Sequence, residues 1–242
     1  VSGSKNAALA LLAGSLFCNG KVTFRNIPVI RDVEVILEIM KGLGSEISRH
    51  GDTVRINNSN IKNAALNPEL VRRLRGSMLL IGPLLSLFGR VKMPYPGGDV
   101  IGARSLDPHL DALRTLGAKV DETGNHFLDI QTSSRLKGAK VVLSESSVTA
   151  TENTMMAAAL AEGETLIKLA ATEPHVQDLA KFLNAAGAKI EGAGTSTIKI
   201  QGQKQLEYSG NLEHEIIPDS DEAMSFAVLA AATRSDVFVK NI

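Results

Sequence analysis

The chain contains no tryptophan, and aromatic residues make up only 4% of its 242 residues. Proteins that hold single-stranded nucleic acid stack its bases on exposed aromatic rings, so this scarcity argues against such a role. The chain also has no excess of charge, because 26 Lys and Arg balance 26 Asp and Glu. Attraction to a nucleic-acid backbone or to an anionic membrane surface depends on net positive charge. We therefore expect neither a nucleic acid nor a membrane as a partner.

Cysteine is almost absent as well. The single Cys18 excludes an internal disulfide and a cysteine-based metal site, and its apolar surroundings predict a buried packing residue. The histidines show no spacing typical of a metal site, and no function is assigned to His50, His126, His175 and His214. We expect no cofactor. The longest apolar run, Met78–Phe88, is interrupted and far shorter than the roughly 20 residues of a membrane span. No charged and apolar leader of a secretion signal is visible, so a cytoplasmic enzyme or binding protein is expected.

What the sequence does contain is a unit that occurs three times. Its clearest markers are three glycines, Gly44, Gly117 and Gly187, which lie 73 and 70 residues apart. Each follows an amphipathic helix and precedes two short strands joined by a turn, over Ile39–Asn57, Ala112–Gln131 and Phe182–Gln201. Glycine suits that position because the residue after a helix often takes a positive φ. Each unit begins with an almost wholly apolar helix followed by a strand; these helices are expected at Asn6–Phe17, Ser77–Gly89 and Asn153–Gly163.

The repeat predicts an α/β fold. A helix that is apolar on every side belongs in the centre of a domain, whereas an amphipathic helix has a wet face. We expect three units around a pseudo-threefold axis, with the apolar helices inside and the sheets outside, over residues 1–215. A fourth apolar helix and its following strand, within Glu222–Ile242, have no hairpin after them. Residues 216–242 are therefore predicted to begin a truncated second domain of the same fold; the alternative is that the last helix caps the first domain.

The starts of the buried helices are candidate anion sites. Free N–H groups and the helix dipole point at the same place there, and Lys5 and Arg75 add positive charge. Arg104 is a third cation, in the segment "PYPGGDVIGARSLDPHL". Arginine binds oxyanions through two parallel hydrogen bonds and lysine through a point contact. The set predicts a small, strongly anionic ligand, such as a phosphate with a carboxylate. Asp99, directly after two glycines in the same segment, is either a turn residue or a proton donor on a mobile loop.

Four stretches together resemble a known family: "SGSKNAAL", "RGSMLLIGPLL", "PGGDVIGARSLDPHLDALRTLGA" and "SVTATENTMMAA". In this order they are similar to UDP-N-acetylglucosamine 1-carboxyvinyltransferase, an enolpyruvyl transferase of peptidoglycan synthesis, and the similarity covers essentially the whole chain. The sister enzymes that make 5-enolpyruvylshikimate 3-phosphate share the fold but are the weaker match. The resemblance implies two domains of three repeats each, closing over a cleft, of which the second is largely absent here.

The resemblance also implies the reaction and the site. Enolpyruvyl would pass from phosphoenolpyruvate to the 3-hydroxyl of the sugar, with release of phosphate. Lys5, Arg75 and Arg104 match the phosphoenolpyruvate-binding cations, and Asp99 and Lys5 are the implied catalytic residues. Asn6 matches a sugar contact. The remaining implied contacts hold the uridine and the diphosphate: Ser105, Leu106, Asp107, Pro108, Ser147, Val148 and Thr149. The oligomeric state is not predicted.

Several positions depart from the family pattern. Ser105 replaces a usual Pro, and Thr149 replaces a usual Gly in the diphosphate-contacting stretch. Glu145 stands where Lys is common, and Leu87 and Ser220 each stand where Arg is frequent. These departures affect the predicted diphosphate contacts more than the predicted phosphoenolpyruvate contacts.

Two classes of function follow from the sequence. The retained Lys5, Arg75, Asp99 and Arg104 favour an enolpyruvyl transferase. The departures favour a non-catalytic relative that binds a sugar nucleotide or a partner. The resemblance places the general base, an Asp of the second domain, beyond Ile242, so the chain alone is predicted to be inactive. His109 is placed by its motif near the ligand, although a lone histidine is more often structural.

Overall fold

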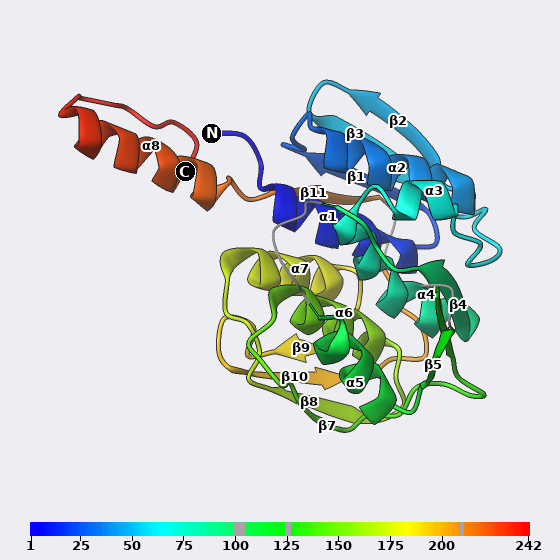
Figure 1. Ribbon diagram of the computed structural model, residues 1–242. Coiled ribbons are helices and arrows are strands. Elements are labelled where there is room, and N and C mark those ends of the chain that lie inside the picture. The colour runs from blue at the N-terminus through cyan, green and yellow to red at the C-terminus, as the bar shows by residue number, and fades with distance from the viewer. Residues whose placement is uncertain (99–104, 124–126, 209–210) are drawn as a thin grey trace.

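The computed structural model describes residues 1–98, 105–123, 127–208 and 211–242. Figure 1 shows three similar units packed together and a terminal helix that lies apart from them. The first unit comprises α1 (Lys5–Gly14), η1 (Ser15–Phe17), β1 (Lys21–Arg25), α2 (Arg31–Leu43), β2 (Glu46–His50) and β3 (Thr53–Asn57). The second comprises α3 (Pro68–Val71), η2 (Arg75–Leu80), α4 (Ile81–Phe88), β4 (Arg90–Pro94), α5 (Asp107–Thr115), β5 (Lys119–Thr123) and β6 (Phe127–Gln131). The third comprises β7 (Lys140–Val142), α6 (Val148–Ala159), β8 (Glu164–Lys168), α7 (Pro174–Ala185), β9 (Ile190–Glu191) and β10 (Thr197–Gln201). The α/β fold of three repeats is confirmed.

Each unit has its own sheet, built around the predicted hairpin. The strand orders are β11-β1-β3-β2, β7-β8-β10-β9 and β4-β6-β5, where β11 spans Leu212–Glu215. The sequence did not predict the parallel neighbour of the first strand in each unit. β11 pairs in parallel with β1, and β7 pairs in parallel with β8. In the second sheet an isolated parallel bridge joins Ala65 to Lys92 at the equivalent edge. The last strand of the chain therefore completes the sheet of the first unit.

The apolar helices form the centre, as expected, but two of their boundaries differ from the prediction. All residues of α1 from Ala7 onward are buried, and so are Ala150 to Ala159 of α6. α6 begins at Val148 rather than at Asn153, because the Ser147 side chain caps it by accepting a hydrogen bond from the Ala150 N–H. The second central segment starts as a 3₁₀ helix, η2, and becomes an α-helix only at Ile81. Pro83 fits there because the first turn of an α-helix leaves its N–H groups unpaired.

The last helix, α8 (Ser220–Thr233), differs from the predicted helix and strand. None of its residues is buried; Met224 in the helix keeps 64% of its surface exposed, and Phe238 in the segment after it keeps 84%. Residues 234–242 form no strand, so the strand predicted after the helix is wrong for this chain. A strand needs a neighbour to accept its hydrogen bonds, and no sheet lies beside this segment in Figure 1. Among the described residues, no helix is long and apolar enough to cross a bilayer.

The three cap glycines take positive φ angles of 110°, 96° and 102° at Gly44, Gly117 and Gly187, which confirms the predicted helix ends. Their surroundings differ. A Cβ on Gly187 would lie 2.6 Å from the Glu207 carbonyl oxygen, whereas a Cβ on Gly117 would meet nothing within 4 Å.

This pair gives a stability prediction with an internal control. Gly117→Ala places a side chain at positive φ and should lower the free energy of unfolding by about 1–2 kcal/mol. Gly187→Ala adds a clash with backbone and should cost about 1–3 kcal/mol more. Urea denaturation of both variants measures the difference. Equal losses would show that the backbone at Glu207 moves away freely.

Candidate active site

The described part of the chain has one large cavity of about 1020 Å³ where the starts of the helices meet. In each unit the inner, buried helix (α1, η2 with α4, or α6) starts at the cavity and runs away from it. The following strand leads back, and the outer, amphipathic helix (α2, α5 or α7) again starts at the cavity wall. The wall therefore receives residues from the first turns of α1, η2 and α6, from those of α2, α5 and α7, and from α8. The N–H groups of a helix's first turn have no partners within the helix, so the cavity is lined with donors and positive dipole ends.

Most of the predicted site residues line this cavity. Those that do are Lys5, Asn6, Arg75, Ser105, Asp107, Pro108, Ser147, Val148 and Thr149. Leu106 does not: its side chain is 6% exposed and belongs to the hydrophobic core. Any contact of Leu106 with a ligand is confined to its backbone. Asp99 and Arg104 lie outside the described residues. Of the departures from the family pattern, Glu145 lies exposed at the cavity, whereas Leu87 and Ser220 do not line it.

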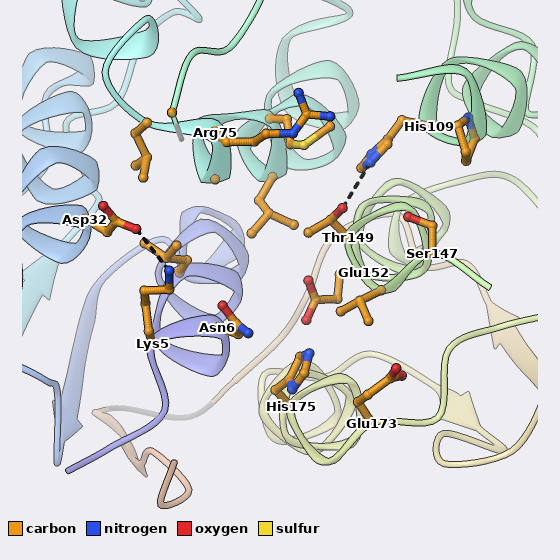
Figure 2. Close-up of a pocket in the computed structure, with 18 of the residues that line it drawn as sticks. Lys5, Asn6, Asp32, Arg75, His109, Ser147, Thr149, Glu152, Glu173 and His175 are labelled. Carbon is orange, nitrogen blue, oxygen red and sulfur yellow. Dashed lines mark hydrogen bonds and ion pairs between the residues drawn. The ribbon is translucent and has the colours of Figure 1, made fainter. Parts of the chain in front are cut away.

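One side of the cavity carries positive charge (Figure 2). The Lys5 ammonium forms an ion pair with Asp32 of α2 at 3.4 Å, which holds the Lys5 side chain against the wall. Arg75 lies on η2, in the neighbouring wall. Gly98 approaches Arg75 so closely that a Cβ on Gly98 would lie 3.0 Å from the Arg75 Cβ. The segment that leads into Asp99 is therefore packed against this cationic side.

A buried hydrogen-bond chain fixes His109 in the cavity wall where α5 packs against α6. The Asn153 Oδ1 accepts the Gly82 backbone N–H at 2.6 Å, so the amide orientation of Asn153 is determined. Its Nδ2 donates to the Met78 carbonyl oxygen at 2.9 Å and faces the His109 Nδ1 at 3.2 Å. Because Nδ2 can only donate, the His109 Nδ1 must be the acceptor and carries no proton.

The protonation state of His109 then determines whether the Thr149 hydroxyl donates or accepts in the hydrogen bond between them. His109 is 3% exposed; burial, helped by nearby Arg75, lowers its pKa to about 3, so the ring is neutral. Its single proton is on Nε2, which lies 3.1 Å from the Thr149 Oγ1. The ring donates to the Thr149 oxygen, as the dashed line in Figure 2 marks. The Thr149 hydroxyl proton is left to point elsewhere, and Thr149 lines the cavity at the start of α6.

The side of the cavity formed by α6 and α7 is acidic instead. Glu152 is 1% exposed, and Figure 2 shows its side chain near those of Glu173 and His175. Burial, with a further contribution from the Glu173 charge, raises the pKa of Glu152 well above its usual range. Burial also lowers the pKa of His175. Burial therefore favours the uncharged forms of both Glu152 and His175.

Sequence reasoning missed Asp32, Glu152, Glu173 and His175. The repeat could have predicted Asp32 and Glu173. Together with Asp107 they occupy equivalent positions, because each lies at the start of the outer helix of its unit. Glu152 gives no such signal: in the sequence it stands among other polar residues, directly before the predicted apolar helix Asn153–Gly163.

The comparisons with known proteins agree with this geometry. The family model described as EPSP synthase (3-phosphoshikimate 1-carboxyvinyltransferase) matches residues 1–242. The UDP-N-acetylglucosamine 1-carboxyvinyltransferase 2 of Carboxydothermus hydrogenoformans is 46% identical over 242 residues, which are 100% of this chain and 57% of that protein. The UDP-N-acetylglucosamine 1-carboxyvinyltransferase of Trichormus variabilis is 45% identical over 245 residues, covering 100% of this chain and 54% of that protein. The chain thus spans about half the length of the curated relatives it matches.

Solved structures give the same fold. The enolpyruvyl transferase NikO from Streptomyces tendae superposes with a TM-score of 0.81 at 24% identity, over 93% of this chain and 53% of that one. An EPSP synthase from Acinetobacter baumannii superposes with a TM-score of 0.72 at 23% identity, over 96% of this chain and 52% of that one. At these identities the likeness concerns the fold alone. Because the family model matches the whole chain, this protein belongs to the EPSP synthase (3-phosphoshikimate 1-carboxyvinyltransferase) family.

Proposed function

We propose that this chain is part of an enolpyruvyl transferase that moves enolpyruvyl from phosphoenolpyruvate to the 3-hydroxyl of UDP-N-acetylglucosamine, in the cytoplasmic stage of peptidoglycan synthesis. The observation that carries the proposal is the convergence of Lys5, Arg75 and the helix starts on one cavity large enough for both substrates. The names of the relatives at 45–46% identity support the choice of acceptor.

In the proposed mechanism the phosphoenolpyruvate anion lies on the cationic side, against Lys5, Arg75 and Arg104. Asp99 donates a proton to the methylene carbon, which leaves the neighbouring carbon electron-poor. The sugar 3-hydroxyl attacks that carbon and loses its proton to a base outside this chain, giving a tetrahedral adduct. Asp99, now a carboxylate, takes back a proton from the methyl group as the phosphate leaves, which restores the double bond. Lys5 and Arg75 stabilise the charge on the departing phosphate.

We further propose that residues 1–215 form one domain and that residues 216–242 begin a second. The absence of any buried residue in α8 supports this division, because a helix with Phe226 and Leu229 on its surface normally packs against something. The relatives, about twice as long as this chain, have room for such a domain. On this proposal the cleft lacks one wall and its base, and the 242-residue chain is inactive alone.

The test is phosphate release from phosphoenolpyruvate. We call the protein extended to the length of its relatives the full-length protein. It should release phosphate when UDP-N-acetylglucosamine is present, and the 242-residue chain should not exceed background. If the full-length protein is inactive with this acceptor but active with shikimate 3-phosphate, the acceptor is wrong and the reaction class stands. If it binds the sugar nucleotide without turnover, a non-catalytic binding function is correct. The observation that favours this second function is Glu145 at the cavity, because its negative charge would repel a diphosphate.

The Thr149 hydroxyl should contribute to diphosphate binding. Because His109 donates to its oxygen, its proton is available to a phosphate oxygen beside the start of α6. A hydrogen bond to a charged group contributes about 1.5–3 kcal/mol, so Thr149→Val should weaken UDP binding about ten- to a hundredfold. Calorimetric titration with UDP measures this. Thr149→Ser keeps the hydroxyl and should bind almost normally; equal losses in both variants would rule out the hydroxyl as the cause.

A further inference from the structure

Asp178 is a charged side chain in the interior of the third unit. It lies in the second turn of α7 and is 2% exposed, whereas its buried neighbours on the helix, such as Leu179 and Phe182, are apolar. Burying a carboxylate costs free energy unless hydrogen bonds and an opposite charge compensate for it. A buried acid at this place therefore indicates contacts that an apolar side chain could not make.

Both carboxylate oxygens of Asp178 bind the segment that follows the third unit. The Oδ1 accepts from the His214 Nε2 at 3.0 Å, and the Oδ2 accepts from the Ile217 backbone N–H at 3.4 Å. The His214 ring packs edge-on against Phe24 of β1 and Phe182 of α7, with ring centres 6.4 and 5.6 Å away. Asp178 thus links α7 to β11 and to the residue two positions after the end of that strand.

The same segment supports the start of α1. The Ile217 carbonyl oxygen accepts the Ser4 N–H at 2.8 Å, and Ser4 is the N-cap of α1. Two residues after Ile217, the Asp219 Oδ2 accepts the Lys5 N–H at 3.2 Å. The contacts therefore run from Asp178 through residues 217–219 to the first residue of α1. Lys5 is that residue, and it lines the cavity.

The contacts of this segment come from two units. The first unit holds it through Ile216, whose N–H donates to the Arg25 carbonyl oxygen at 3.1 Å and whose own carbonyl oxygen accepts from the Asn26 side chain at 2.9 Å. These bonds cannot place Lys5 relative to the opposite wall of the cavity, because Lys5 belongs to the first unit as well. Asp178 adds a contact from the third unit, and α7, which carries it, begins at that opposite wall.

We propose that Asp178 is a positioning residue for the reaction: by binding His214 and the Ile217 N–H, it fixes residues 214–219 and, through them, the place of Lys5 relative to the third unit. Asp178 does not itself line the cavity. The inference rests on the proposed function, because that function makes Lys5 a cation for phosphoenolpyruvate. It adds what that function leaves open, namely how a cation of the first unit is kept in register with the wall formed by the third.

The first experiment compares two ligands of the full-length protein that depend on different walls. Steady-state phosphate release gives kcat/KM for phosphoenolpyruvate, and calorimetric titration gives the dissociation constant of UDP. Asp178→Leu removes both hydrogen bonds; it should lower kcat/KM about ten- to a hundredfold, because a small displacement of Lys5 is costly, and leave UDP binding unchanged. His214→Phe keeps the ring packing, removes one bond and should act in the same direction. Asp178→Asn keeps an acceptor for the Ile217 N–H and should lose much less.

A matched control removes another enclosed carboxylate. Asp129 is 9% exposed and accepts from the Arg90 guanidinium at 2.9 Å, within the sheet of the second unit. Asp129→Leu should lower the thermal unfolding temperature and change neither kcat/KM for phosphoenolpyruvate nor UDP binding. A general loss of stability is thereby separated from a displacement of Lys5.

Amide hydrogen exchange of the full-length protein tests the positioning directly. In Asp178→Leu, residues 1–5 and 212–219 should exchange about tenfold faster or more, while β8 and β10 keep their protection. Asp129→Leu should leave residues 1–5 and 212–219 as in the wild type. The inference is overturned if Asp178→Leu and His214→Phe leave exchange at residues 1–5 unchanged, speed exchange equally everywhere, or weaken UDP binding as much as they lower kcat/KM. If the wild type releases no phosphate, the proposed function fails instead, and exchange at residues 1–5 still decides whether Asp178 holds the start of α1.

Discussion

In the full-length protein, replacing Asp99 with Asn should lower turnover by about 10²–10⁴-fold, the usual contribution of a general acid. Asn has the shape of Asp but cannot supply the proton that the proposed mechanism delivers to the methylene carbon of phosphoenolpyruvate. Gly98, the residue before Asp99, lines the cavity and packs against Arg75, so the segment leads from the cationic wall where the phosphate is expected. Substrate binding should change much less than turnover, because Lys5 and Arg75 remain. Steady-state phosphate release gives both quantities.

A second substitution separates a proton donor from a turn residue. Asp99→Cys should keep turnover, because a thiol can also deliver a proton, and it should make the enzyme sensitive to an epoxide that alkylates cysteine. The wild type should resist the same epoxide, since a carboxylate is a much poorer nucleophile than a thiolate. Mass spectrometry detects the adduct. Near-normal turnover of Asp99→Asn, or an adduct on Asp99 of the wild type, would contradict the assignment.

The fold could be predicted from the sequence because the residues that mark its repeat act locally. The glycines that end the outer helices, the all-apolar inner helices and the short hairpins each follow from backbone and burial preferences within about 20 residues. The parallel strands β7 and β11 were not predictable in the same way. β11 completes the sheet of the first unit from the other end of the sequence, and its pattern in LEHE gives no sign of that partner.

The candidate site was predictable where residues match a motif and unpredictable where function depends on contacts across units. Lys5, Arg75 and Thr149 were found by their motifs, and they do meet at one cavity. The state of His109 depends on Asn153, 44 residues away, and on an amide orientation that the Gly82 backbone fixes. The spacing of residues in the sequence does not predict such a chain of hydrogen bonds. The replacement of glycine by Thr149 weakens the diphosphate assignment when read alone, yet in the structure it adds a hydroxyl donor.

Asn153 should be among the most sensitive positions for stability. It is 1% exposed and joins three groups from the second unit, so its loss leaves the Gly82 N–H, the Met78 carbonyl oxygen and the His109 Nδ1 without their partner. Each orphaned group costs about 1–3 kcal/mol. Asn153→Leu should therefore lower the free energy of unfolding by about 4 kcal/mol, a large part of the stability of a domain this size. Urea denaturation of the 242-residue chain measures the loss.

The neighbouring Thr154 provides the control for that variant. Thr154 is equally buried on α6, and its hydroxyl donates only to the Ala150 carbonyl oxygen of the same helix. Thr154→Val should cost about 1 kcal/mol, the value of one ordinary hydrogen bond. Asn153→Asp distinguishes the two ends of the amide, because Asp still accepts from Gly82 but cannot donate to Met78. It should be nearly as unstable as Asn153→Leu, since a buried carboxylate facing a carbonyl oxygen is repelled. If both Asn153 variants unfold within about 1 kcal/mol of Thr154→Val, the chain of hydrogen bonds from Gly82 to His109 does not hold the units together.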